Sequence, residues 1–255
     1  MVPVEITAED LNVVSLGDVY GYEPIYSGES FAAHVYRNQI DLSHSLRIER
    51  DGELVSVALL AFRGPRAWVG GFGVAPRHRR HGLGYRCAQQ MLTVAAQQGA
   101  QAIELEVLVE NDAARRLYEK VGFVIVDELR VWRASERGTV RNLELVAHSE
   151  ATIARIATTS PAWQREPGTI ARSGPSALID VAGAYAFVRP SAAGALIILD
   201  AHAADVDTAI HLCKKLELGF EMKLLNESAR SALTHGLEDN GWEVARSQYR
   251  MSMTL

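Results

Sequence analysis

Residues 71–84 read Gly-Phe-Gly-Val-Ala-Pro-Arg-His-Arg-Arg-His-Gly-Leu-Gly, an apolar run that leads into a basic turn punctuated by glycines. A helix is predicted to follow from Leu83 to Gln98, because apolar residues recur there at every fourth position. Glycines let backbone amides approach a ligand, and a helix N-terminus offers N–H donors with a partial positive charge. With the charges of Arg79 and Arg80, the turn predicts a pyrophosphate site; a solvated basic turn capping an ordinary helix is the alternative.

A meander of strands precedes this turn. The patterns predict strands over residues 45–50, 53–62 and 67–74, with Asp51-Gly52 as a hairpin turn. Further upstream they predict a short strand at 4–6 and helices at 8–19 and 30–40. The turn is not a P-loop, because no Gly-Lys-Ser/Thr follows. It also lacks the third glycine of the dinucleotide-binding fingerprint.

The segment after the turn alternates between strand and helix patterns. Residues 102–109 predict a strand with Glu104 and Glu106 on the face opposite the apolar side chains. Asn111 can cap a helix over 112–120 that ends at Gly122-Phe123, and a strand is expected over 124–132. The alternation predicts an α/β (α+β) fold with a mixed sheet.

The second half resembles the first in its order of elements, which indicates a weak internal repeat. A linker is predicted at 134–141, and strands follow at 185–188, 195–200, 219–225 and 243–253, with helices at 205–216 and 226–238. Asn226 and Gly241-Trp242 match Asn111 and Gly122-Phe123, but the Asn-to-Gly spacing is 15 residues instead of 11. No basic glycine turn follows Asp200. We therefore expect a complete domain at 1–136 and a degenerate, non-catalytic one at 137–255.

Composition excludes several classes of protein. Of the 255 residues, 48% are hydrophobic and 22% are charged, and the net charge is −5. These values argue against a disordered chain and against nucleic-acid or anionic-membrane partners. Cys87 and Cys213 lie far apart, which argues against a disulfide framework and a cysteine-based zinc site. With no signal-peptide pattern and no long apolar run, we expect a cytoplasmic enzyme or binding protein.

Three segments together give a family resemblance over residues 4–132. They are Gly71 to Pro76, the Arg-x-x-Gly-x-Gly run from Arg79 to Gly84, and the stretch from Leu105 to Phe123 with its Asn, Leu-Tyr and Gly-Phe elements. In this order and spacing the chain resembles the GCN5-related N-acetyltransferase (GNAT) superfamily. The second half looks similar to the degenerate C-terminal repeat of tandem members.

This resemblance implies acetyl-coenzyme A as the donor, with its pyrophosphate on the glycine turn and its pantetheine arm along the strand end. The implied coenzyme-binding residues are Phe72, Gly73, Val74, Arg79, Arg80, His81, Gly82, Leu83, Gly84, Tyr85, Asn111 and Tyr118. His78 and His81 suit phosphate contact better than metal, and no metal is expected. The other histidines are interpreted as structural or surface groups.

Acetyl transfer to an amine needs a neutral amine, a stabilised oxyanion and a proton for the leaving thiolate. The family places its general acid at the tyrosine matched by Tyr118; a tyrosine packed at a helix end is the alternative. Glu106, twelve residues earlier, matches the base of the N-terminal-alanine acetyltransferase branch. At its ordinary pKa it would need burial or a water relay, and a solvent-facing or Arg-paired strand glutamate is the alternative. A backbone N–H near Gly73 or Val74 could polarise the thioester carbonyl.

The resemblance also implies that the loop at 20–28 and the helix at 30–40 wall the acceptor site. Tyr20, Tyr22, Tyr26 and Phe31 of this segment are either an aromatic wall or core. The sequence thus predicts direct acetyl transfer to the primary amine of a small molecule or peptide. A non-catalytic acyl-coenzyme A sensor and a nucleotide-binding protein are the rival hypotheses. The acceptor is not identified, and a homodimer is left open.

Overall fold

The computed structural model describes residues 6–14, 26–135, 143–156, 162–191, 194–217 and 219–255. The chain divides into two compact units. Unit 1 consists of Met1–Val126 and Arg250–Leu255, and unit 2 of Asp127–Tyr249. Both are built from a mixed sheet with helices, so the predicted mixed α/β class is confirmed, whereas the tandem repeat and its boundary at 136/137 stay predictions.

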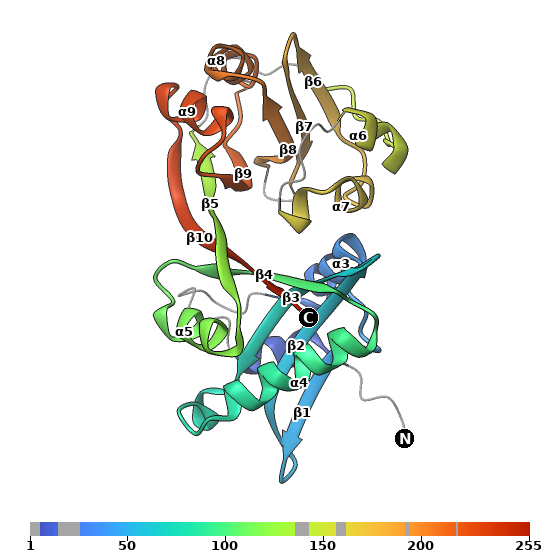
Figure 1. The fold of residues 1–255 in the computed structure, drawn as a ribbon. Helices are drawn as coiled ribbons and strands as arrows, with labels where there is room; N and C mark the ends of the chain where they lie inside the picture. The colour runs from blue at the N-terminus through green and yellow to red at the C-terminus, as the bar shows by residue number, and fades with distance from the viewer. Residues whose placement is uncertain (1–5, 15–25, 136–142, 157–161, 192–193, 218) are drawn as a thin grey trace. The chain divides into compact units, whose positions relative to one another are not determined.

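Unit 1 contains a sheet in the order β1-β2-β3-β4, with the end of β10 next to β4. β1, β2 and β3 are antiparallel neighbours, and β3 and β4 are parallel. α4 crosses one face of the sheet, and α1 and α3 lie on the other (Figure 1). The elements are α1 (Ala8–Val13), α3 (Gly28–Asn38), β1 (Leu46–Arg50), β2 (Glu53–Arg63), β3 (Arg66–Val74), η1 (Pro76–His78), α4 (Leu83–Gln97), β4 (Ala102–Leu108), α5 (Asp112–Val121) and the start of β5 (Val124–Ala134).

Most elements of unit 1 lie where the patterns predict them. Asp51 and Gly52 both have positive φ, 54° and 78°, as a two-residue hairpin between twisted strands requires. Of the helix predicted over 8–19, residues 8–13 are helical and 15–25 lie outside the described residues. Of the strand predicted at 4–6, only Ile6 is described, and it is not in a strand.

Unit 2 contains a sheet in the order β10-β5-β9-β8-β7-β6, in which β8 and β9 are the parallel pair. Its core includes Trp132, Leu212 and Leu237. The elements are the rest of β5, α6 (Glu150–Ile156), η2 (Trp163–Arg165), α7 (Pro167–Ala171), β6 (Ala177–Val181), β7 (Ala184–Pro190), β8 (Leu196–Ala203), α8 (Val206–Lys215), β9 (Met222–Ser228), α9 (Ala232–Asp239) and β10 (Glu243–Thr254). Most of the predicted linker, residues 136–141, lies outside the described residues.

The prediction that Asn226 begins a helix is wrong. Asn226 lies in β9 with φ 56°, where two β9 residues stand opposite one β5 residue. Asparagine tolerates this left-handed conformation, so the residue marks a bulge instead of a cap. The cap is Ser231, whose hydroxyl accepts from the Thr234 N–H at 3.0 Å. From Ser231 to Gly241 the spacing is 10 residues, so the extra helical turn inferred from the sequence does not exist.

The two helix ends match closely. The N–H of Phe123 donates to the carbonyl of Tyr118, and the N–H of Trp242 donates to that of Leu237, both at 3.0 Å. Gly122 and Gly241 lie between them with positive φ. Local chain geometry therefore supports the proposed repeat, with Leu237 at the position of Tyr118.

Candidate functional site

The candidate site lies where β3 and β4 diverge. These parallel strands pair from Arg66–Ala102 to Trp68–Glu104, and both then continue without further mutual pairing among the described residues, to Val74 and Leu108. Backbone groups on the facing edges are thereby left for other partners. Such an opening between parallel strands is suited to an extended ligand.

A bulge at Gly70 accompanies the divergence. β3 pairs with β2 through Val69–Leu60 and Gly71–Leu59, which leaves Gly70 as the extra residue. A Cβ on Gly70 would lie 2.8 Å from the Trp68 ring, and one on Gly73 would lie 2.7 Å from Val14 of the α1 end. Side chains at these positions would collide with the elements that cover this face, so glycine is required for close packing.

The orientation of the β3 backbone identifies one amide at the opening. The Ala75 N–H donates to Val55 on β2 at 2.8 Å, and the Gly73 carbonyl accepts from the Ser56 hydroxyl, also on β2, at 2.7 Å. Because backbone groups alternate in direction along a strand, the Val74 N–H points away from β2. Of the two amides considered for the oxyanion, Val74 faces the opening and Gly73 does not.

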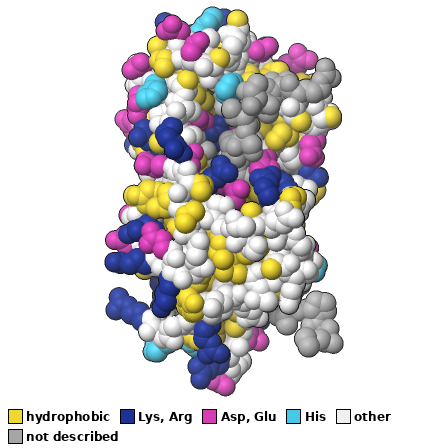
Figure 2. Space-filling model, viewed as in Figure 1, with side chains coloured by type: hydrophobic (Ala, Val, Ile, Leu, Met, Phe, Trp, Pro, Cys, Tyr) yellow, Lys and Arg dark blue, Asp and Glu magenta, His cyan; other side chains and the backbone are white. Residues whose placement is uncertain are grey.

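The basic turn connects β3 to α4. Arg80 and Gly82 have positive φ, 64° and 73°, and Gly82 is the N-cap of α4 with no side-chain cap. The first backbone N–H groups of α4 therefore point into the turn, and the N-cap residue has no side chain to accept a hydrogen bond from them. Arg80 and His81 are exposed. Lys and Arg side chains also gather on the surface over α5 (Figure 2), the helix that carries Arg115, Arg116 and Lys120.

Arg79 has a structural role that the sequence did not indicate. Its Nε donates to the Val74 carbonyl at 2.8 Å, and an Nη donates to the Val14 carbonyl at 3.3 Å. The guanidinium thus joins the ends of β3 and α1 while its charge stays beside the turn. Its expected contact with phosphate remains a prediction.

The remaining predicted coenzyme residues lie along α4 and α5. Leu83 begins α4, and a Cβ on Gly84 would stand 3.4 Å from Leu117, so this glycine brings the two helices together. Lys120 lies 5.0 Å from the centre of the Tyr85 ring. The Asn111 side chain accepts from the Ala114 N–H at 3.2 Å, as the predicted cap does.

Tyr118 is buried, with 6% of its surface exposed. Its ring packs edge-on against Phe72 of β3 and Phe123, with centroid distances of 6.1 and 5.7 Å. This packing is compatible both with a general acid and with a tyrosine that only packs at a helix end. The contact with Phe72 brings the end of α5 next to β3, the strand that borders the opening.

Glu106 lies on the opposite face of the sheet. Its neighbours Leu105 and Val107 are buried, and the Glu106 carboxylate accepts from the indole N–H of Trp68 at 2.8 Å. Glu104, on the same face, is ion-paired with Arg250 at 3.0 Å. Two carboxylates thus share a face: Glu104 is ion-paired with Arg250, and Glu106 accepts a hydrogen bond from Trp68.

The predicted acceptor wall is only partly described. Tyr20 and Tyr22 lie outside the described residues. Tyr26 packs against Phe31 and against His34, with ring centroids 5.9 and 5.3 Å apart. Sequence reasoning treated His34 as structural or surface and did not consider Trp68 or Ser56. Only the alternation of β3 could have placed Trp68 on the face of Glu106.

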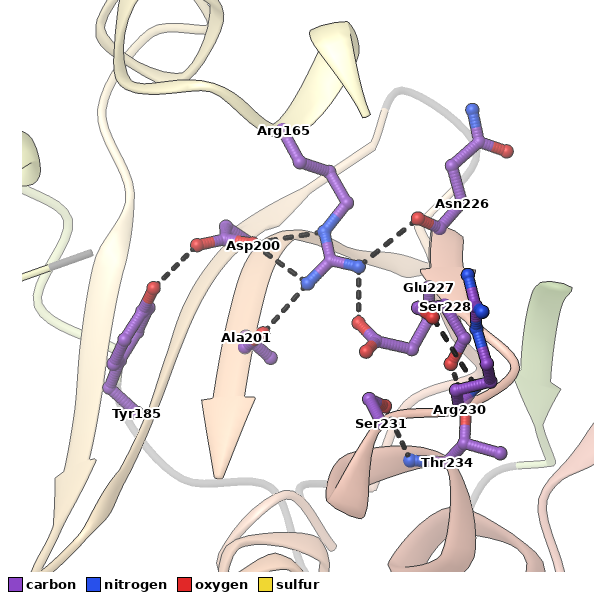
Figure 3. Close-up of polar contacts among 10 residues, drawn as sticks. All are labelled: Arg165, Tyr185, Asp200, Ala201, Asn226, Glu227, Ser228, Arg230, Ser231 and Thr234. Atoms are coloured by element: carbon purple, nitrogen blue, oxygen red, sulfur yellow. Dashed lines mark hydrogen bonds and ion pairs between the residues drawn. The ribbon is translucent and has the colours of Figure 1, made fainter. Parts of the chain in front are cut away.

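Unit 2 fills the corresponding place with its own side chain. β8 and β9 pair from Leu196–Met222 to Ile198–Leu224 and then continue, as β3 and β4 do. Figure 3 shows the Arg165 guanidinium between them. It donates to the carbonyls of Ala201 on β8 and Asn226 on β9, at 2.7 and 3.2 Å.

Two buried carboxylates surround this guanidinium. Arg165 donates to Asp200 at 2.9 Å and to Glu227, and Tyr185 donates to Asp200 at 2.7 Å. Burial alone would lower the pKa of Arg165, but Glu227 and Asp200 raise it above its usual value. Burial raises the pKa of Asp200, and Arg165 opposes that shift. No sequence signal predicted this network.

The described residues contain neither a membrane-spanning helix nor a cluster of metal ligands. None of the helices is long and apolar enough to cross a membrane. Among the same residues, no group of three or more His, Cys, Asp and Glu side chains is arranged to hold a metal ion.

Comparison with known proteins extends these observations. Residues 18–123 match the model of the acetyltransferase (GNAT) family. A protein from Pyrococcus horikoshii is 19% identical, covering 99% of this chain and 88% of that chain, with a TM-score of 0.67. A GCN5-related N-acetyltransferase from Sphaerobacter thermophilus is 16% identical, covering 97% and 92%, with a TM-score of 0.65. At these identities the likeness concerns the fold. No curated protein matches the chain.

Proposed function

We propose that the chain transfers acetyl from acetyl-coenzyme A directly to a primary amine, because residues 18–123 match the model of the acetyltransferase (GNAT) family. The amine and the thioester would be bound together in a ternary complex. Cys87 and Cys213 are buried, and burial raises the pKa of both thiols, so neither is suited to carry the acetyl group covalently.

The observation that carries this proposal is the opening between β3 and β4. Glu106 lies on the face of the sheet that α3 covers, and α5, which carries Tyr118, lies on the face that α4 covers. A thioester lying in the opening would present its carbonyl to the amine on one side and its sulfur to Tyr118 on the other. Acceptor base and leaving-group acid are then separated by the reacting carbon, as direct attack requires.

The turn fits the coenzyme by its chemistry. The glycine N-cap, the N-terminus of the 15-residue helix α4 and the charges of Arg79 and Arg80 all favour phosphate oxygens. The space beside Gly82 is open, because an added Cβ would meet nothing within 4 Å. We therefore assign the pyrophosphate to this turn and the pantetheine arm to the edge of β3.

A residue of the candidate site can be assigned to each step of the proposed acetyl transfer. Glu106 accepts a proton from the ammonium group, directly or through water, and the amine nitrogen attacks the thioester carbon. The Val74 N–H stabilises the oxyanion, and collapse of the tetrahedral intermediate breaks the C–S bond. Tyr118 gives its proton to the leaving thiolate, which yields coenzyme A and the amide.

We propose that unit 2 does not hold a coenzyme. The Arg165 guanidinium occupies the place between β8 and β9, and Leu237 stands where unit 1 has Tyr118. Its sequence also lacks a basic glycine turn after Asp200. One molecule of coenzyme A per chain is expected in titration calorimetry.

The test is release of coenzyme A thiol from acetyl-coenzyme A across a panel of primary amines, including peptides, polyamines, aminoglycosides and amino acids. We expect release with some of these amines, and about 100-fold slower turnover in Tyr118→Phe with nearly unchanged coenzyme affinity. If the chain binds coenzyme A but releases no thiol from acetyl-coenzyme A with any amine, the result would favour the non-catalytic sensor hypothesis. Stabilisation by ATP and not by coenzyme A would favour the nucleotide-binding hypothesis.

A further inference from the structure

Trp68 donates a hydrogen bond to the Glu106 carboxylate. Its side chain is buried, with 2% exposed, and its indole N–H donates to Glu106 Oε2 at 2.8 Å. An indole is a neutral donor, whereas Arg250 brings a full charge to Glu104. Trp68 therefore helps to fix the direction of the Glu106 carboxylate through a hydrogen bond from a donor that carries no charge.

His34 in turn fixes Trp68 and the bulge. Its Nε2 lies 3.1 Å from the Gly70 carbonyl, and because a carbonyl only accepts, Nε2 carries the hydrogen. Nδ1 then accepts from the Asn38 amide at 3.1 Å. The centroids of the imidazole and Trp68 rings lie 6.2 Å apart, and a Cβ added to Gly70 would lie 2.8 Å from the same indole.

The His34 ring is neutral at physiological pH. Burial and, to a smaller extent, the charge of Arg37 lower its pKa to about 4, against the opposing effect of the hydrogen bond to Gly70. A neutral ring can keep one donor and one acceptor in fixed directions, which a doubly protonated ring could not. The chain of contacts thus runs from α3 through the β3 bulge to β4.

We propose that Trp68 and His34 are positioning residues for the base Glu106, with Trp68 acting on the carboxylate and His34 acting through Trp68 and Gly70. This inference rests on the proposed function. It links the segment expected to wall the acceptor site to the group that deprotonates the acceptor, so the acceptor and its base are ordered by the same contacts.

A double-mutant cycle tests the proposal. Trp68→Phe keeps an aromatic ring and removes the N–H, and loss of a hydrogen bond to a charged group corresponds to a fall in kcat of roughly 10-fold to 100-fold. The KM for acetyl-coenzyme A should stay the same. In the Glu106→Gln background, Trp68→Phe should cost less than about 2-fold, because the group it positions is gone. An equal loss in both backgrounds would overturn the proposal.

Further variants separate positioning from folding. Trp132→Phe is a matched control, since Trp132 is also buried and its indole nitrogen has no hydrogen-bond partner among the described residues. It should leave kcat unchanged. His34→Gln retains an amide donor and should keep more activity than His34→Leu. Equal kcat values in the two His34 variants would remove His34 from the proposal.

A measurement without turnover keeps this inference separate from the proposed function. The chain has four tryptophans, and the Trp68 indole N–H signal in a ¹H–¹⁵N spectrum can be assigned by its loss in Trp68→Phe. We expect this signal to be protected from exchange and to shift in Glu106→Gln. An unshifted, rapidly exchanging signal would refute the contact even if acetyl transfer is found. If the signal shifts but Glu106→Gln keeps full activity, the contact stands and the base assignment fails.

Discussion

Replacement of Arg165 by methionine should destabilise unit 2 severely. Methionine approximates the length of the side chain and removes its charge and five donors. Arg165 is 3% exposed, and its guanidinium donates to two carboxylates and two backbone carbonyls. All four acceptors lose the hydrogen bonds from Arg165 in the variant. Tyr185 remains the hydrogen-bond donor to Asp200.

The expected cost follows from the uncompensated charge. One guanidinium faces Asp200 and Glu227, so the ionised network carries one excess negative charge, and the variant would carry two. Removal of one partner from a buried ion pair costs about 3–5 kcal/mol, and the stranded carbonyls add to this. Arg165→Met/Asp200→Asn/Glu227→Gln should recover most of the loss, because no buried charge is left.

Urea unfolding followed by tryptophan fluorescence measures this free energy. Trp132, Trp163 and Trp242 report on unit 2, and Trp163 lies two residues from the substitution. Arg133→Met is the matched control, because Arg133 also contacts a carboxylate, that of Glu243 at 2.9 Å, but with both side chains exposed. Exposed pairs contribute about 1 kcal/mol or less.

The pH dependence of the loss of stability in Arg165→Met provides a test that can refute this reasoning. Burial already raises the pKa of Asp200, and loss of the guanidinium raises it further. A carboxyl group whose pKa is higher in the folded state binds more protons there, so the deficit of the variant should shrink as the pH falls from 7.5 to 5. If Arg165→Met unfolds like Arg133→Met, or if its deficit is independent of pH, the reasoning fails.

Three further predictions concern unit 1. Gly82→Val should abolish coenzyme A binding in calorimetry, whereas Gly52→Val, at a similar φ of 78° and with equally open surroundings, should not; retained binding would contradict the phosphate assignment. Ser56→Ala should lower kcat several-fold at constant KM. The Gly73 carbonyl and the Val74 N–H belong to one peptide group, and the variant removes the Ser56 hydroxyl that polarises this group by donating to the carbonyl. An unchanged kcat would remove Ser56 from the mechanism. The pKa of His34 is about 4 in the folded state and 6.5 in the reference state, so stability should fall by about 1.4 kcal/mol per pH unit between pH 6.5 and 4 as the unfolded chain takes up the proton. His34→Gln should lack this slope in urea titrations.

Local signals in the sequence predicted unit 1 well. The glycine turn, the start of α4 at Leu83 and the cap at Asn111 depend on nearby residues, and each lies where its pattern placed it. Local pattern alone did not indicate which of the two candidate amides, Gly73 or Val74, faces the opening. That depends on which β3 groups face β2, and the hydrogen bonds with Val55 and Ser56 show that the Val74 N–H points away from β2.

Contacts between distant segments were beyond local patterns. Trp68 and Glu106 come from different strands, and Arg165 meets Asp200 and Glu227 only because β8 and β9 diverge. Asn226 shows the opposite failure. Asparagine is typical both of helix N-caps and of left-handed positions in strand bulges, so the residue type alone fits either structure. Only the pairing of β9 with β5 shows that Asn226 lies at a bulge.

The assignment of residues 250–255 to unit 1 has a consequence for biosynthesis. Arg250 pairs with Glu104, Met253 packs against Gly122, and the Leu255 N–H donates to Gln101 at 2.9 Å. The whole of unit 2 must therefore leave the ribosome before unit 1 has its last contacts. Long-range closure of this kind is slow, so unit 1 is expected to stay incomplete, with apolar surface exposed, while unit 2 is synthesised. A chain that stops at Tyr249 would lose these contacts from the unit that it synthesised first.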